Sequence, residues 1–258
     1  MTGETDSGRS LFQITGTDRI SFLQGLVSND LLPLARAPGI RWAALLTPQG
    51  KYLADFFVVR PEGAAGEDHL ILDIATPLAE ATVRRLTMYR LRADVQIAPL
   101  PLSVTRGLEA PPLGAFADPR HPALGWRAYG AAGGPPVIDW NAIRVAHCIP
   151  ESGIELIPNE TYLLEAGFER LHGVDFRKGC YVGQEVTARM KHKTELRKGL
   201  ITVAIDGAAP IGTPILSEGR EAGTLFTHSQ GHAIAYLRFD RVGAMGAGEA
   251  RLFPPPAV

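Results

Sequence analysis

Apolar positions in the first hundred residues recur at two different spacings, which predicts both helices and strands. Helical spacing predicts an amphipathic helix over residues 17–31, capped by Thr17, and another that begins at Thr76 and runs to about residue 91. Two apolar runs within residues 40–59 flank a Pro-Gln-Gly turn, the pattern of a β-hairpin. Two further strands are predicted by short apolar runs, at 69–74 and 94–97. Helices and strands mixed in this order are typical of an α+β fold.

The second half of the chain changes character twice. Residues 110–136 hold six prolines and five glycines, which predicts a long loop between subdomains. From residue 199 onward, short alternating runs broken by Gly or Pro predict a small all-β domain. Between these segments, helices are predicted at 138–148 with Asp139 as cap, at 159–167 and at 180–191. The predicted division is therefore 1–109 (α+β), 110–136 (loop), 137–198 (α+β) and 199–258 (all-β).

Composition narrows the class of protein. With 26 Lys and Arg against 27 Asp and Glu, the net charge is −1, which argues against a globally basic nucleic-acid binder. The two cysteines cannot form a disulfide framework and indicate a reducing compartment. We see neither a signal-like segment near residue 1 nor an apolar run long enough for a membrane helix. These features predict a soluble cytoplasmic protein without a membrane partner.

Positive charge is concentrated around one cysteine, Cys180. Residues 173–198 hold seven basic and three acidic residues, a net of +4, so the rest of the chain carries −5. By default such a run is a solvated surface; the alternative is a site for a polycarboxylate, a phosphate or RNA. Aromatic residues, on which bases could stack, are scarce in this run, which argues against RNA as the ligand. The sequence has no Cys-x-x-Cys motif, and we expect no resident metal.

Cys180 has a functional and a plain structural interpretation. If a helix begins at Gly179-Cys180, then Cys180, Gln184, Thr187 and Lys191 share one polar face, opposite an apolar stripe. A thiol at a helix N-terminus, close to Lys178, has more thiolate character. The structural alternative is a small buried side chain, and Cys148 is assigned to that class.

The octapeptide KGCYVGQE (178–185) resembles the signature of the folate-binding YgfZ family. This family is similar in turn to the aminomethyltransferase (T-protein) of the glycine cleavage system. Further matching segments occur in the family's order along nearly the whole chain: FLQGLVSND (22–30), LLTPQGKYLADFFV (45–58), YRLRADV (89–95) and IPESGIEL (149–156).

The resemblance implies a fold and a role. The fold is an α+β core of two ferredoxin-like subdomains followed by a small β-barrel, arranged around a central cavity. The implied ligand is tetrahydrofolate. The implied role is the assembly or maintenance of iron–sulfur clusters, with assembly factors and client enzymes, some of them tRNA-modifying, as partners. Cys180 would be a functional thiol, either a transient cluster ligand or a redox-active group.

Site residues follow from the resemblance combined with charge. Glu165 matches the T-protein glutamate that holds the pterin, whose paired N–H donors suit a carboxylate; its plain alternative is a surface acid. The predicted residues are, for folate, Glu165, Asp55, Gln184, Tyr181 and Arg189; for the polyglutamate tail or another anion, Lys191, Lys193, Arg197 and Lys198; and for chemistry, Cys180, Lys178 and Asp55.

One departure bears on catalysis. Where the T-protein has two adjacent aspartates, this sequence has Ala54 and Asp55. The T-protein also lacks the cysteine of the octapeptide. Both differences favour an accessory protein over an aminomethyltransferase or other one-carbon transferase, which is the alternative. A third reading is a folate-binding module in which Cys180 is only structural.

Overall fold

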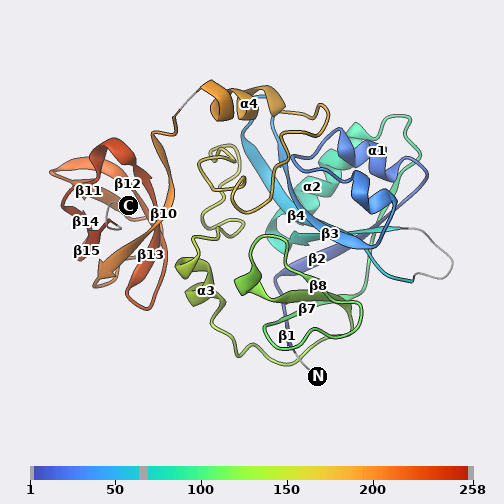
Figure 1. Cartoon of the computed structure of the whole chain (residues 1–258), viewed down its shortest axis with the longest axis horizontal. Helices are drawn as coiled ribbons and strands as arrows, with labels where there is room; N and C mark the ends of the chain where they lie inside the picture. The colour runs from blue at the N-terminus through green and yellow to red at the C-terminus, as the bar shows by residue number, and fades with distance from the viewer. Residues whose placement is uncertain (1–2, 64–68, 194, 255–258) are drawn as a thin grey trace.

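Two antiparallel sheets, a closed barrel and four α-helices make up the described residues, 3–63, 69–193 and 195–254 of a computed structural model. The barrel stands at one end of the molecule, and the larger sheet with its helices stands at the other (Figure 1). None of the helices in the described part of the chain is both long and apolar enough to span a membrane.

The larger sheet has five strands in the order β3-β4-β5-β2-β6. Its β3 strand shows why it separates two cores: Ala43 and Leu45 pack against the helices, while Trp42 and Ala44 face the opposite core. The predicted hairpin is confirmed as β3 and β4. The strands are β2 (Arg9–Thr15), β3 (Gly39–Leu46), β4 (Tyr52–Arg60), β5 (Leu70–Ala75) and β6 (Gln96–Pro99).

Two helices cover one face of this sheet. α2 (Thr76–Tyr89) confirms the helix that was predicted to begin at Thr76. The residue at its N-cap position is Ala75. α1 spans only Arg19–Gln24, so the prediction of a helix over 17–31 was too long. The hydroxyl of Thr17 donates to Asp94 instead of capping the helix, and a 3-10 turn (η1, Leu32–Ala35) follows α1.

Two predictions need correction, one because of the smaller sheet and one because of residues 137–197. Its order is β1-β7-β9-β8, so the segment 110–136 contributes two strands and is not simply a loop. The described residues of 137–197 contain α3 and α4 but no strand, because turns closed by short-range backbone bonds replace extended structure there. The division into domains and the ferredoxin-like form stay predictions. The strands are β1 (Glu4–Thr5), β7 (Ser103–Gly107), β8 (Phe116–Ala117) and β9 (Trp126–Gly130), with a 3-10 turn, η2 (Pro122–Leu124).

The helices of the second half were predicted with mixed success. α3 (Trp140–Ala146) is confirmed together with its cap, since the Asp139 side chain accepts from the Ala142 amide at 2.9 Å. Residues 159–167 form turns, so the helix predicted there was wrong. α4 spans Gln184–Lys193 and begins four residues after Cys180.

The all-β domain is confirmed as a closed six-stranded barrel. Its first strand begins at Lys198, one residue before the predicted change of character, and its inner residues form their own apolar core. The strands are β10 (Lys198–Asp206), β11 (Pro214–Ser217), β12 (Arg220–Ser229), β13 (His232–Arg238), β14 (Met245–Ala247) and β15 (Ala250–Phe253), with a 3-10 turn, η3 (Phe239–Arg241).

Buried ion pairs join the two sheets. Asp73 of β5, fully buried, accepts from Arg9 of β2 at 2.6 Å and from Arg127 of β9 at 2.8 Å. The Tyr129 hydroxyl of β9 also donates to Asp73. Burial by itself raises the pKa of Asp73, but the two arginines outweigh it and lower the pKa to about 2. The carboxylate therefore stays ionised and fastens the sheets together.

Candidate functional site: the segments around Cys180

Cys180 is exposed, and it lies outside α4. The prediction that this residue starts the helix was therefore wrong, and the argument from the helix N-terminus does not apply to it. Thr187 is buried instead of lying on an open polar face, and its hydroxyl turns back to the Gly183 carbonyl at 3.4 Å. Gln184, the first residue of α4, is half-buried.

The chain before Cys180 is fastened to the segment 22–30. The Ser28 hydroxyl donates to the Gly173 carbonyl at 2.6 Å. The Asn29 side-chain amide donates to the carbonyls of His172 and Trp42, both at 2.7 Å. Ser28 and Asn29 are buried polar residues with long-range partners, so they fix where residues 172–175 lie.

Lys178 is bound to the same segment. Its ammonium donates to the carbonyls of Gln24, Val27 and Asn29, and the residue is only 8% exposed. Burial lowers the pKa of Lys178 to about 8, although Asp30 and Asp175 act in the opposite direction. The hydrogen-bond partners of the buried Lys178 ammonium are therefore three backbone carbonyls.

The chain after Cys180 is fastened to the hairpin turn of residues 47–51. Gly183 has φ +83°, and a Cβ there would lie 2.5 Å from the Thr47 carbonyl oxygen. A Cβ on Gly50, whose φ is +75°, would lie 2.8 Å from the Cβ of Val186. Both positions need glycine because backbone meets backbone at this contact. The TPQG and KGCYVGQE segments therefore pack directly on each other.

Tyr181 also holds the chain after Cys180 on the core. It is buried, and burial raises the pKa of its hydroxyl to about 12. The Lys178 ammonium lies 4.9 Å from the centroid of its ring, within the range of a cation–π contact. Cys180 is therefore an exposed thiol, with buried Lys178 two residues before it and buried Tyr181 directly after it, where three sequence segments meet.

Asp55 is surrounded by donors. Its Oδ2 accepts from Trp42 Nε1 at 2.8 Å, and its Oδ1 accepts from the hydroxyls of Tyr52 and Ser152, both at 2.6 Å. Burial and the Asp55 charge raise the pKa of Tyr52, so this hydroxyl stays protonated and donates. All three donors are side chains of the protein, and Asp55 is only 3% exposed.

Glu165 lies between the core and the barrel. Its Oε2 accepts from the Tyr236 hydroxyl of β13 at 2.7 Å, and its Oε1 lies 4.0 Å from the Lys198 ammonium of β10. Burial and this hydrogen bond raise the pKa of Tyr236. Two parallel hydrogen bonds from a pterin would require both oxygens of Glu165, and one of them is engaged by Tyr236. As the side chains stand, neither Glu165 nor Asp55 has two free oxygens for a pterin edge.

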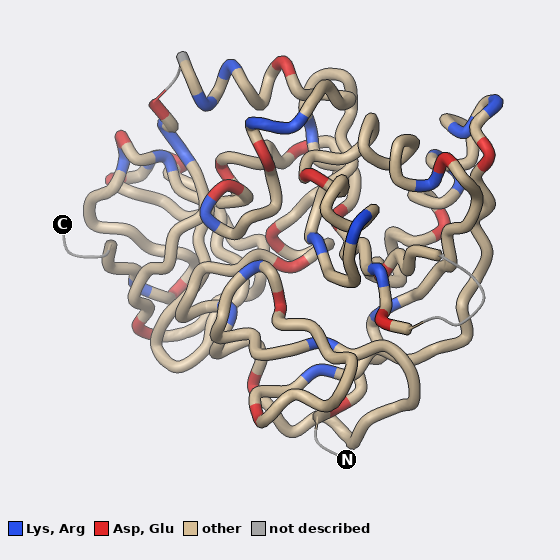
Figure 2. Tube along the Cα trace, turned by 45° about the vertical axis from the view of Figure 1, so that its right-hand side comes forward, with Lys and Arg blue, Asp and Glu red and all other residues tan. Residues whose placement is uncertain are grey.

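The predicted anion-binding residues are spread along α4 and the start of the barrel (Figure 2). Arg189 and Arg197 are exposed. Lys191 is ion-paired with Glu169, and Lys198 lies near Glu165. The side chain of Lys193, the last residue of α4, is outside what the structure describes. The buried position of Lys178 removes one of the seven basic residues from this surface.

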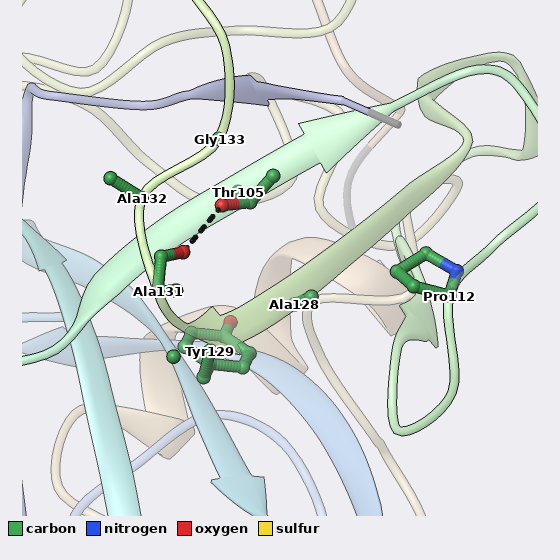
Figure 3. Close-up of a pocket in the computed structure, with 8 residues that line it drawn as sticks. Thr105, Pro112, Ala128, Tyr129, Ala131, Ala132 and Gly133 are labelled. Carbon is green, nitrogen blue, oxygen red and sulfur yellow. Dashed lines mark hydrogen bonds between the residues drawn. The ribbon is translucent and has the colours of Figure 1, made fainter. Parts of the chain in front are cut away.

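Three cavities lined by described residues have none of these predicted site residues in their walls. One of about 290 Å³ is lined by Thr105 and Tyr129, and the Thr105 hydroxyl donates to the Ala131 carbonyl at its edge (Figure 3). A cavity of about 370 Å³ is lined by Glu4 and Leu108. A third, next to Tyr236, holds about 70 Å³, well below the roughly 300 Å³ that small-molecule sites need. In the part of the chain that the structure describes, no three His, Cys, Asp or Glu side chains are grouped for a metal ion.

Comparison with known proteins supports the sequence resemblance. The family model described as "CAF17, C-terminal beta-barrel domain" matches residues 197–257. The chain is 31% identical to the mouse protein "Iron-sulfur cluster assembly factor IBA57, mitochondrial", over 91% of this chain and 77% of the mouse protein. It is 30% identical to the human protein of the same name, with coverage of 87% and 74%. A Mycosarcoma maydis homologue is also 30% identical, and the chain spans 63% of its length.

A solved structure shows the same fold. The glycine cleavage system aminomethyltransferase T from Bartonella henselae superposes with a TM-score of 0.74 over 96% of this chain and 82% of that one. The two sequences are 14% identical, so this likeness concerns the fold alone. With its C-terminal barrel, its α+β core and its relatives of 30–31% identity, the chain belongs to the IBA57/CAF17 (YgfZ) family, and its fold resembles that of the glycine cleavage T-protein.

Proposed function

We propose that the protein is an iron–sulfur cluster assembly factor in which Cys180 is the functional thiol. The observation that carries the proposal is the placement of Cys180: it is exposed, while Lys178 before it and Tyr181 after it are buried, and the chain on each side is held on another segment. A merely structural cysteine would be expected inside the core. The names of the mouse and human relatives support the same role.

A cluster contact at Cys180 must be shared. Stable clusters are held by about four ligands, and among the described residues no three His, Cys, Asp or Glu side chains are grouped to supply them. The remaining ligands would come from an assembly factor, a client enzyme, a second chain or a small thiol. Cys180 would act either as a transient ligand of the transferred cluster or as a redox-active group.

The test is client activity in cells that lack the endogenous protein. We expect Cys180→Ser to lower the activity of cluster-dependent tRNA-thiolating enzymes, whereas Cys148→Ser, the matched control, leaves it near the wild-type level. Both variants must accumulate to equal amounts. Undiminished client activity in Cys180→Ser would remove the thiol from the mechanism. The cytoplasmic location stays a prediction; the named relatives are mitochondrial.

Tetrahydrofolate binding is the second part of the proposal and rests on the family resemblance. A pterin at Glu165 would have to displace the Tyr236 hydroxyl or use Oε1 alone. We therefore expect Tyr236→Phe to bind folate at least as well as wild type and Glu165→Ala to bind it more weakly, in a titration followed by fluorescence. Equal affinity of Glu165→Ala and wild type would eliminate the pterin clamp.

A one-carbon transferase is the alternative. It would depend on Asp55 and Glu165, whose carboxylates already accept hydrogen bonds from neighbouring side chains. We expect no turnover when the protein is mixed with tetrahydrofolate and an aminomethylated carrier protein. Measurable turnover that Asp55→Asn abolishes would favour the transferase instead.

A further inference from the structure

The Lys178 ammonium has one backbone carbonyl for each of its three N–H bonds. The acceptors are Gln24 at 2.8 Å, Val27, and Asn29 at 3.0 Å, all within the single segment 22–30. A protonated lysine has three donors and no acceptor. The three carbonyls therefore match the ammonium group of Lys178 donor for acceptor.

We infer that Lys178 is a positioning residue whose charge holds the exposed Cys180 thiol in place. The inference deepens the proposed function, because it concerns the same thiol. Lys178 is two residues before Cys180, and its side chain crosses to a segment about 150 positions earlier in the chain. Few other contacts are available between Asp175 and Tyr181: Phe176 is half-buried, and Arg177 and Gly179 are exposed.

Other contacts secure the two ends of this stretch independently. The Asp175 amide donates to the Ser28 carbonyl at 3.1 Å, before Lys178. The Gln184 amide donates to the Tyr181 carbonyl at 3.2 Å, after Cys180. Between these points, Lys178 supplies the polar contact that draws the stretch onto the core. Without it, the chain from Arg177 to Cys180 would be a free loop between two fixed ends.

The protonated form is the one that fits the three carbonyls. A neutral amine has two donors and a lone pair, so one carbonyl would face a lone pair instead of a hydrogen. Among the described residues, the charged and titratable groups that act on the ammonium are Asp30, Asp175 and the ring of Tyr181. The ammonium therefore needs its positive charge to donate to all three carbonyls.

The first test uses NMR on the full chain. Lys178→Met keeps the length and apolar stem but removes the donors, and Arg177→Met is the matched control, since Arg177 is an exposed neighbouring cation. We expect the Gly179 and Cys180 amides of Lys178→Met to lose most of their {1H}-15N NOE. We also expect the Val27 and Asp175 amides to exchange about tenfold faster. The amides of β4 should stay unchanged, and Arg177→Met should match wild type.

The second test keeps the native lysine and so does not depend on how well a variant folds. In the wild-type chain at pH 6, the Lys178 ammonium protons should exchange with solvent slowly enough to give a 1H–15N signal, because each of them is hydrogen-bonded to a carbonyl. That signal should be missing from Lys178→Met and present in Arg177→Met.

Two results would overturn the inference: unchanged NOE and exchange in a folded Lys178→Met, or no slowly exchanging Lys178 ammonium signal in the wild-type chain. Neither readout involves a cluster, folate or a client. A failure of the proposed function would appear instead as full client activity of Cys180→Ser, with the amide behaviour as expected here.

Discussion

At the scale of single residues, the same side-chain type serves different ends depending on what surrounds it. Asp55 was selected from the sequence as a folate-binding or catalytic acid, and the structure shows its carboxylate accepting from three side chains. Asp240, in contrast, is an exposed acid paired with Arg238 on the barrel. The number of buried donors that depend on each carboxylate separates the two, and no sequence pattern contains that number.

We predict that Asp55→Ala lowers the free energy of unfolding by about 2–5 kcal/mol, because it leaves buried donors on Trp42, Tyr52 and Ser152 without an acceptor. Asp240→Ala is the control and should change it by less than about 0.5 kcal/mol. Urea denaturation followed by tryptophan fluorescence measures both. Equal stability of the two variants would mean that the Asp55 network contributes little to folding.

At the scale of elements, the close contact of two turns determines where α4 begins. Helical spacing alone favoured a start at Cys180, but Gly183 has φ +83° and packs on the hairpin turn at Gly50. A left-handed residue interrupts a right-handed helix, so the regular helix starts only at the next residue, Gln184. The contact of Gly183 with the hairpin turn thus keeps Cys180 out of the helix, and it also holds the end of the Cys180 loop on the core.

Gly183→Ala should therefore cost more than backbone strain alone. Gly114 also has a positive φ, +77°, but a Cβ there would meet nothing within 4 Å. We expect Gly114→Ala to cost about 1 kcal/mol and Gly183→Ala at least about 2 kcal/mol more, because its Cβ would overlap the Thr47 carbonyl. Thermal and urea unfolding of both variants checks this, and a similar cost at the two sites would contradict the close contact.

At the scale of the whole molecule, buried polar contacts join the parts. Asp73 of the larger sheet links the two sheets through Arg127 and Tyr129 of β9. Glu165 links the core to the barrel through Tyr236, and Glu155 does the same through the Thr227 hydroxyl. Each of these acids is buried and has its partner far away in the sequence. The parts are therefore held in one arrangement by directional contacts as well as by apolar packing.

The Asp73 contact predicts acid sensitivity with a defined sign. Its folded pKa of about 2 lies below the ordinary value of 3.8. The ionised carboxylate therefore contributes its full stabilisation, about 2 kcal/mol, above about pH 4, and the contribution is lost as the pH falls toward 2. Urea denaturation between pH 7 and pH 2 should show a shallower loss of stability in Asp73→Asn than in wild type. Identical pH slopes would contradict the shift.

The order of the segments was available from the sequence. Two apolar runs around a Pro-Gln-Gly turn predicted the hairpin, Asp139 predicted the start of α3, and the change near residue 199 predicted the barrel. The prediction of a loop at 110–136 was wrong because its prolines and glycines surround two short strands, β8 of two residues and β9 of five, so local composition favoured a loop. The buried polar residues Ser28 and Asn29 belong to the segment 22–30 that resembles the family, but nothing in the local sequence indicated their hydrogen-bond partners.

The sequence by itself determined the kind of elements, their order, the family and the one cysteine of interest, because these depend on local spacing and on recognisable segments. Only the tertiary structure decided that Cys180 is exposed outside α4, that Lys178 binds three carbonyls, and that Glu165 meets Tyr236. Those outcomes depend on contacts between residues as much as 154 positions apart. Burial and the supply of hydrogen-bond partners are properties of the packed chain, so the roles of these charged residues are fixed only when the segments meet.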